Sequence, residues 1–323
     1  MKDENKKELM KAREELDAKV MEIASKPYLM VSELCVLANE PYDSELPMPD
    51  AINEVAKVAS ISKGADYEYF SVSASTKTVF TVTNGSVTQA NVSPTSPSTL
   101  SFSHYDTPED YIYIPDLLES KYDAIALKAA DQMEALDRLE NKLMFDALIA
   151  AAVGSSNTFA DGSGVSKINF AKLVEMVRSM AKFGTKLVLI SGQDVTTDLI
   201  LMDYDTDKNR EVSVEKAGIS KWIKVENYQY THSTTQTVLA TDKAIVVATS
   251  DSQKNRPVHV VRRKVTGIDG QSQKERVVIT AGPGHFVGAA RKLAFSVVVY
   301  ESLGIVVTNA DACAVYKNAT IYS

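Results

Sequence analysis

The sequence predicts a mixed α+β fold organised around one long helix, and three observations support this. Residues 115–153 contain no glycine and, after Pro115, no further proline. Apolar residues recur along this stretch at spacings of three, four or seven, which is the helical period: Leu118, Tyr122, Ile125, Ala129, Met133, Leu136, Leu143 and Ala147. Strand-forming residues precede the stretch, and short apolar runs follow it.

The two ends of the predicted helix differ in character. Asp116 and Glu119 lie in its first turn, where carboxylates interact favourably with the helix dipole. Gly154 follows the last periodic residue and is predicted to supply a left-handed cap. Leu136 and Leu143 lie one heptad apart, so both are predicted to be core residues. Residues 143–153 are apolar almost all round, which predicts burial on several sides.

Composition narrows the class of protein. The 323 residues can form one large domain or two smaller ones, and 45% hydrophobic and 24% charged residues are ordinary for a soluble protein. A net charge of −7 argues against a polybasic nucleic-acid binder, which needs clustered Lys and Arg. The charged N-terminus predicts no signal peptide, and no apolar run approaches the ~18 residues of a membrane span. Cys35 and Cys313 are expected to be buried, reduced thiols.

The region before the long helix contains two further segments. Residues 2–25 form a predicted amphipathic helix, and docking on another subunit or packing on its own domain both remain open. Pro27, Pro41, Pro47 and Pro49 then predict an extended, irregular segment.

Residues 66–114 are predicted to form a long two-stranded hairpin. Asn84-Gly85 is a strong hairpin-turn signal, and the polar tip is placed between Asn84 and Ser98. The aromatic residues Phe80, Phe102, Tyr111 and Tyr113 have few aliphatic neighbours in the segment. Since an isolated hairpin is only marginally stable in water, we expect a neighbouring subunit to support it.

The remainder of the chain predicts alternating helices and strands. A helix is expected from Asn169 to Gly184, a short helical piece near Leu199, and a charged loop over 203–208. The expected strands cover residues 187–190, 238–240, 244–248, 258–261, 276–279, 293–300, 304–307 and 314–316.

No pattern in the sequence predicts a catalytic, cofactor-binding or metal-binding residue. The four histidines, His104, His232, His259 and His285, lack metal-ligand spacing, and structural roles are favoured for them. Residues 282–288 contain three glycines, but Pro283 removes a backbone donor that a phosphate loop would need. Asp203, Asp205 and Asp207 alternate without the Gly and distal Glu of a calcium loop, which favours a solvated loop.

The order of these elements resembles the major capsid proteins of tailed bacteriophages, which have the Hong Kong 97-type (HK97-like) fold. The segments most similar to that family are 121–125, which reads KYDAI, 187–194, which reads LVLISGQD, and 301–312, which reads ESLGIVVTNADA. The resemblance implies an N-terminal arm (1–64), an E-loop hairpin (65–115), a peripheral domain with the spine helix (116–184) and an axial domain (185–323). The C-terminal strands are expected to return toward the peripheral domain.

The resemblance also implies a function. It implies a coat protein that assembles through pentamers and hexamers into an icosahedral shell around double-stranded DNA, without enzymatic activity, cofactor or membrane contact. The expected location is the virion, with assembly in the host cytoplasm, and scaffold, portal and decoration proteins are candidate partners. Some relatives join an E-loop Lys to an Asn of a neighbour. Lys77 and Asn309 are the corresponding candidates here, although the sequence gives no reason to pair them.

Two rival interpretations remain open at this stage. An encapsulin-like bacterial nanocompartment would share the fold but hold cargo enzymes. The charged N-terminal arm and the proline-rich segment after it favour a virion. A soluble α/β nucleotide-binding enzyme that uses the Gly282 region is the second alternative.

Overall fold

The computed structural model describes most of the chain after residue 50. The described residues are 51–71, 97–113, 124–160, 170–206, 217–225, 228–231, 234–252, 256–266, 273–281, 286–287, 290–291 and 294–317. The predicted arm up to residue 50, the hairpin tip over 72–96 and the first turns of the long helix up to residue 123 therefore lie outside the described residues. Cys35 and the Gly282–His285 segment also lie outside them.

The predicted long helix is present as α5 (Ala124–Gly154), whose 31 residues span roughly 46 Å. Leu136 is buried as predicted, but Leu143 is only half-buried at the edge of the core. Met144 and Leu148 are the fully buried residues of this part of the helix instead. In the apolar C-terminal half, Met144, Phe145, Leu148 and Ala152 are buried, while Val153 at its end is exposed.

The end of α5 differs from the prediction. Gly154 is the last helical residue, and Ser156 carries the left-handed backbone, with φ of 59°. The amide of Ser156 donates to the carbonyl of Val153 at 3.2 Å, and the amide of Asn157 donates to the carbonyl of Ala152 at 2.9 Å. This pair of hydrogen bonds is the Schellman motif. Ser156 occupies its left-handed position, where glycine is the usual residue.

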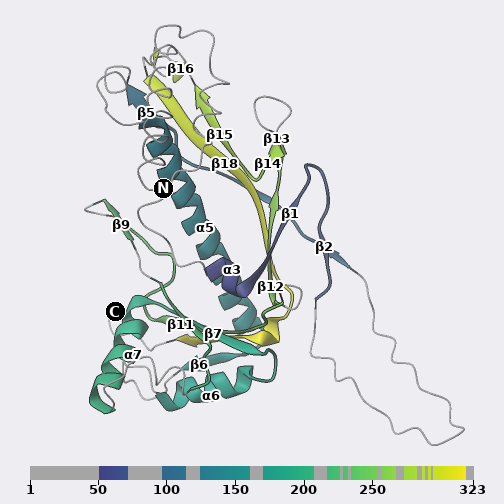
Figure 1. The fold of residues 1–323 in the computed structure, drawn as a ribbon, viewed down its shortest axis with the longest axis vertical. Helices are drawn as coiled ribbons and strands as arrows, with labels where there is room; N and C mark the ends of the chain where they lie inside the picture. Colours follow the sequence, from purple (N-terminus) through teal and green to yellow (C-terminus); the bar gives the residue numbers. More distant parts are fainter. Residues whose placement is uncertain are drawn as a thin grey trace, which may run out of the picture.

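A long sheet forms around β18 (Ala294–Val307), and α5 lies along one of its faces (Figure 1). The strands β12 (Val258–Arg263) and β15 (Arg276–Ala281) pair with successive parts of β18, both antiparallel. The short strands β13 (Val265–Thr266) and β14 (Gln273–Lys274) form a hairpin between them. The sequence predicts two strands separated near Gly304, but β18 runs through that position without interruption.

The opposite edge of β18 binds part of the segment that was predicted to be the returning strand of the hairpin. The strands β4 (Ser103–Asp106) and β5 (Asp110–Tyr113) both pair antiparallel with β18. Strand β1 (Ala56–Ile61) follows the short helix α3 (Ala51–Val55) and pairs parallel with β12. Residues 103–113 thus belong to the subunit's own sheet, which corrects the prediction of one hairpin over 66–114.

A second, five-stranded sheet lies beyond the C-terminal end of α5. Its strands run in the order β6 (Thr158–Ala160), β19 (Cys313–Lys317), β11 (Lys243–Thr249), β7 (Lys186–Ser191) and β8 (Lys221–Lys224). Helix α6 (Phe170–Met180) packs against β11 and β19, and α7 (Gln193–Thr206) follows β7. The 3-10 turn η2 (Ala310–Ala312) leads from β18 into β19.

One core joins the two sheets. Met144, Phe145 and Leu148 of α5 pack in a cluster that contains Val188 and Val247 of the five-stranded sheet. The same cluster contains Val258, Val260 and Leu303 of the long sheet. The C-terminal half of the long helix is therefore the common hydrophobic support of both sheets. The domain boundaries inferred from the sequence remain a prediction.

The remaining differences are local. Residues 203–206 belong to α7 rather than to a charged loop, and α6 ends at Met180 instead of reaching Gly184. The predicted strand 238–240 is absent, because β10 (Thr234–Gln236), which pairs with β9 (Tyr228–Thr231), ends before it. The short strands β16 (Phe286–Val287) and β17 (Ala290–Arg291) pair with each other. Among the described residues, no helix is both long and apolar enough to cross a bilayer.

Candidate functional site

The base of the predicted hairpin crosses the face of the long sheet that points away from α5. Strand β2 (Glu68–Tyr69) pairs antiparallel with β3 (Ser98–Thr99), and the amide of Leu100 donates to the carbonyl of Tyr67 at 2.8 Å. The two chain segments that lead to and from residues 72–96 are thereby held together on the subunit. The two strands at the base of the predicted hairpin are therefore paired, while its predicted tip lies outside the described residues.

Gly304 permits the close approach between the hairpin base and β18. A Cβ atom at this position would lie 2.8 Å from Cδ2 of Leu100 and 3.0 Å from the carbonyl oxygen of Ser101. Leu100 is 6% exposed, so it is a core contact of the subunit. A glycine within a strand often marks such an approach of another backbone, which explains why the strand tolerates it.

Arg263 of β12 fastens the other side of the hairpin base. Its guanidinium lies 4.0 Å from the ring centre of Phe102, and its Nη2 donates to the carbonyl of Ala65 at 2.9 Å. Nη2 is also 3.8 Å from the carboxylate of Asp66. A cation over an aromatic ring adds attraction to the apolar contact. Arg263 therefore joins both chain segments of the hairpin base to the long sheet.

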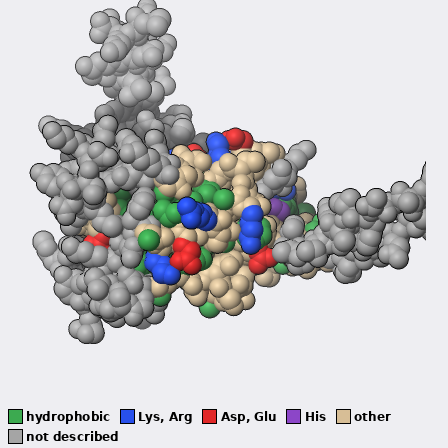
Figure 2. Space-filling view, turned by 90° about the horizontal axis from the view of Figure 1, so that it is seen from below, with side chains coloured by type: hydrophobic (Ala, Val, Ile, Leu, Met, Phe, Trp, Pro, Cys, Tyr) green, Lys and Arg blue, Asp and Glu red, His purple; other side chains and the backbone are tan. Residues whose placement is uncertain are grey.

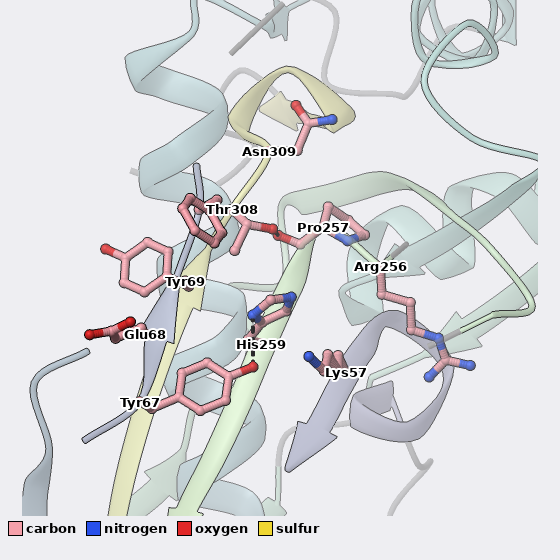
Figure 3. Close-up of a pocket in the computed structure, with 10 residues that line it drawn as sticks. Lys57, Tyr67, Glu68, Tyr69, Arg256, Pro257, His259, Thr308 and Asn309 are labelled. Atoms are coloured by element: carbon pink, nitrogen blue, oxygen red, sulfur yellow. Dashed lines mark hydrogen bonds between the residues drawn. The ribbon is translucent and has the colours of Figure 1, made fainter. Parts of the chain in front are cut away.

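A groove of about 390 Å³ lies beside this base. Its walls come from the hairpin base, β1, the start of β12 and the end of β18 (Figure 3). The hydroxyl of Tyr67 lies 3.2 Å from Nδ1 of His259, and Nζ of Lys57 lies 5.7 Å from the Tyr67 ring centre. Phe70, which also lines the groove, is 56% exposed.

His259 cannot serve as a cation in this groove at neutral pH. Burial and the nearby positive charge of Lys57 lower the pKa of His259 to about 4. Both effects disfavour the charged form of an imidazole. The groove therefore presents aromatic rings and lysine, with a neutral histidine in its floor.

Asn309, one of the two candidate cross-linking residues, lines the same groove. Its partner candidate, Lys77, lies outside the described residues, so the pairing remains a prediction. The groove nevertheless places Asn309 next to the hairpin base of its own subunit. A neighbouring chain would have to reach this groove to meet it.

The other residues singled out in the sequence do not form a chemical site among the described parts of the chain. His104 stacks on Tyr300 with 5.7 Å between ring centres, while His232 and His285 lie outside the described residues. No group of His, Cys, Asp and Glu in the described ranges has the arrangement of a metal site. Cys313 is a buried free thiol, and burial raises its pKa to about 12.

The face of the molecule that Figure 2 shows has no large area of one charge among its visible described side chains. Seen from the end that carries α6 and the five-stranded sheet, the visible described side chains mix basic, acidic and apolar groups (Figure 2). Exposed apolar side chains occur on the long sheet instead, at Tyr113 of β5 and Ile279 of β15. Single exposed apolar side chains are ordinary, so these two do not by themselves mark a contact surface.

Sequence reasoning missed a buried charge cluster between α5 and the long sheet. Glu140 and Glu301 are 0% and 1% exposed and lie between Arg262 and Arg276. One signal was available in the sequence, namely that Glu301 directly follows an unbroken apolar run over residues 297–300. A charged residue there had to be either exposed or paired.

Comparisons with known proteins identify the fold. No protein-family model matches the chain, and no curated protein matches its sequence. The chain is similar to a protein of Mycobacterium phage Adephagia, with a TM-score of 0.56 and 11% identity over 91% of this chain and 99% of that one. A protein of Mycobacterium phage Bobi gives a TM-score of 0.55 and 12% identity over 90% and 99%.

A capsid structure of cyanophage P-SCSP1u gives a TM-score of 0.50 and 14% identity over 87% of this chain and 92% of that one. These similarities extend over almost the whole length of both partners in each comparison. The chain therefore has the HK97-like capsid fold, as its order of elements predicts.

Proposed function

We propose that this chain, which has the HK97-like capsid fold, is the coat subunit of a tailed-phage head and closes into an icosahedral shell around double-stranded DNA. The observation that carries the proposal is the extent of the structural similarity. It includes 87% of this chain and 92% of the cyanophage capsid chain. The fold predicts a structural protein rather than an enzyme.

The surface of the long sheet supports the same proposal. Phe70, Tyr113 and Ile279 are large apolar side chains that remain 56%, 52% and 40% exposed in the isolated subunit. The paired base of the predicted hairpin lies beside Phe70 and the groove. Large assemblies bury apolar surface between neighbouring copies, and a neighbour placed on this face would cover these residues.

The proposal that the shell contains DNA is supported by the charge of the subunit. The net charge of −7 and the mixed surface charges are compatible with packaged DNA that the subunit does not bind specifically. A shell that encloses cargo proteins is the competing assignment. Particles isolated from the natural source should contain nuclease-resistant DNA, whereas a cargo enzyme without DNA would contradict the phage assignment.

Assembly itself is tested with the purified full-length chain. Light scattering and negative-stain electron microscopy should show closed particles of uniform size, or pentamers and hexamers that form such particles as concentration rises. The proposal would be wrong if the chain stays a folded monomer across salt and concentration. A Phe70→Asp variant should keep its circular dichroism spectrum and lose closed particles, because it places a charge on the expected contact surface.

A further inference from the structure

The contact between α5 and the long sheet contains a group of charges that is unusual for a hydrophobic interface. From α5 come Asp137 and Glu140, from β12 comes Arg262, from β15 comes Arg276, and from β18 comes Glu301. Glu275, which directly precedes β15, lies 3.3 Å from Arg262. Two guanidinium groups thus face four carboxylates, so the cluster holds an excess of negative charge.

The two buried carboxylates in this cluster are not equally well paired. Glu140 accepts hydrogen bonds from Arg262 on both oxygens, at 2.7 and 2.6 Å, and lies 3.2 Å from Arg276. Glu301 accepts one bond, from Nε of Arg276 at 2.8 Å, through its Oε2. Its Oε1 is buried and has no hydrogen-bond partner. On β4, Glu301 lies opposite Tyr105, which packs against the apolar core and contributes no positive charge.

We propose that Glu301 is a proton-operated latch between α5 and β18. With a proton on Oε1, the cluster contains one negative charge fewer, and the helix packs stably on the strand. Loss of that proton to solvent leaves a second buried carboxylate close to Glu140, and the helix–strand contact is weakened. The inference concerns the isolated subunit, so it does not depend on the proposed shell function.

The electrostatics of the site agree with this assignment. Burial, together with the negative charge of Glu140 and against the opposing effect of Arg276, raises the pKa of Glu301 to about 7. The acid therefore titrates near neutral pH, well above an ordinary glutamate. Because the folded state holds this proton more tightly than the unfolded state, the contribution to stability is complete below pH 4.5 and is lost as pH rises through about 7.

Infrared difference spectroscopy of the full-length protein tests the protonation directly. A carboxylic-acid C=O band should disappear with a midpoint near pH 7, and Glu301→Gln should remove this band. Glu275→Gln, which changes a partly exposed carboxylate of the same cluster, should leave it in place. Absence of the band between pH 5 and 8 in the unchanged protein would overturn the proposal, and this measurement needs no variant to fold.

Hydrogen exchange tests whether the proton controls the contact. After correction for the intrinsic effect of pH, amides of residues 133–141 should exchange up to about 30-fold faster at pH 8.5 than at pH 5.5. The Glu301→Gln protein should show no such change, because the amide stays neutral while its oxygen still accepts from Arg276. Amides of β11 in the five-stranded sheet are the internal reference. Equal pH dependence in both proteins would show that Glu301 is not the latch.

Discussion

Glu140 of the long helix and Arg262 of β12 form a two-point ion pair inside the protein, with nitrogen–oxygen distances of 2.7 and 2.6 Å. Burial alone would raise the pKa of Glu140, but the hydrogen bonds and charge of Arg262, with help from Arg276, hold it below its ordinary value. The same contact raises the pKa of Arg262 further. Removing one partner of such a pair leaves an uncompensated buried charge.

The first prediction follows from this pair. Arg262→Met should lower the free energy of unfolding by about 3–5 kcal/mol, because Glu140 remains buried without its main partner. Arg263→Met is the matched control at the next position, on the opposite face of the sheet, and should cost about 1 kcal/mol through its lost contact with Phe102. Urea denaturation of both variants gives the comparison, and equal losses would contradict the special role of Arg262.

The second prediction concerns residues 72–96, the predicted tip of the hairpin. Replacing residues 72–96 with a short Gly/Ser linker should leave the subunit folded, because β2, β3 and Leu100 remain and loop closure depends weakly on length. Closed particles should not form. Circular dichroism and thermal melting report on folding, and electron microscopy reports on assembly. Normal shells from this variant would show that the hairpin is not an assembly element.

The third prediction tests the approach at Gly304. Gly304→Ala should cost about 1–3 kcal/mol, because the new methyl group overlaps Leu100. In the double variant with Leu100→Ala the two costs should not add, since the smaller side chain relieves the overlap. Gly154→Ala has open space around it in α5 and should instead stabilise by about 0.5–1 kcal/mol. A double variant whose cost equals the sum of the single variants would contradict this contact.

The fourth prediction is a pH dependence that arises in the groove. His259 binds its proton less tightly in the folded than in the unfolded protein, so its contribution to stability is complete above pH 6.5 and falls as pH drops toward 4. The loss should be about 1–2 kcal/mol, reduced by the partial exposure of the ring.

His259→Gln should remove this acid-side loss, and His104→Gln, at the exposed stacked histidine, should retain it. Because Glu301 acts in the opposite direction over much of the same range, the effect is read from the difference between each variant and the unchanged protein. Chemical denaturation at pH 4.5, 5.5 and 7.5 provides that difference. Parallel curves for His259→Gln and the unchanged protein would contradict the assignment.

The sequence predicts where individual strands lie better than it predicts which strands pair with one another. The segments 187–190, 244–248 and 258–261 are strands as predicted. The first two are unbroken runs of aliphatic residues, and the third is interrupted only by His259. The pairing of residues 103–113 with β18 could not be read from the sequence. It joins residues almost 200 positions apart, and hairpin-like composition does not specify which edge a strand will bind.

The candidate site was predictable only in outline. The groove depends on the crossing of four segments, and its existence follows from tertiary packing rather than from any motif. Two predictions that took a glycine as the end of an element were wrong. Gly304 lies inside strand β18, and the residue with the left-handed backbone after α5 is Ser156 rather than Gly154. In both places a tertiary contact or a cap geometry outweighed the intrinsic preference of the residue.

The chain passes between the long sheet and the five-stranded sheet three times, through the end of α5, through residues 250–257 and through residues 308–312. These passages are bonded to one another. The hydroxyl of Ser155 donates to the carbonyl of Ala310 at 3.2 Å, and the amide of Thr308 donates to the carbonyl of Pro257 at 2.7 Å. The third connection is thus hydrogen-bonded to both of the other two. Because these bonds join the connections within one subunit, we expect the angle between the two sheets to change little. Any difference in curvature within an assembly would then arise at the contacts between copies.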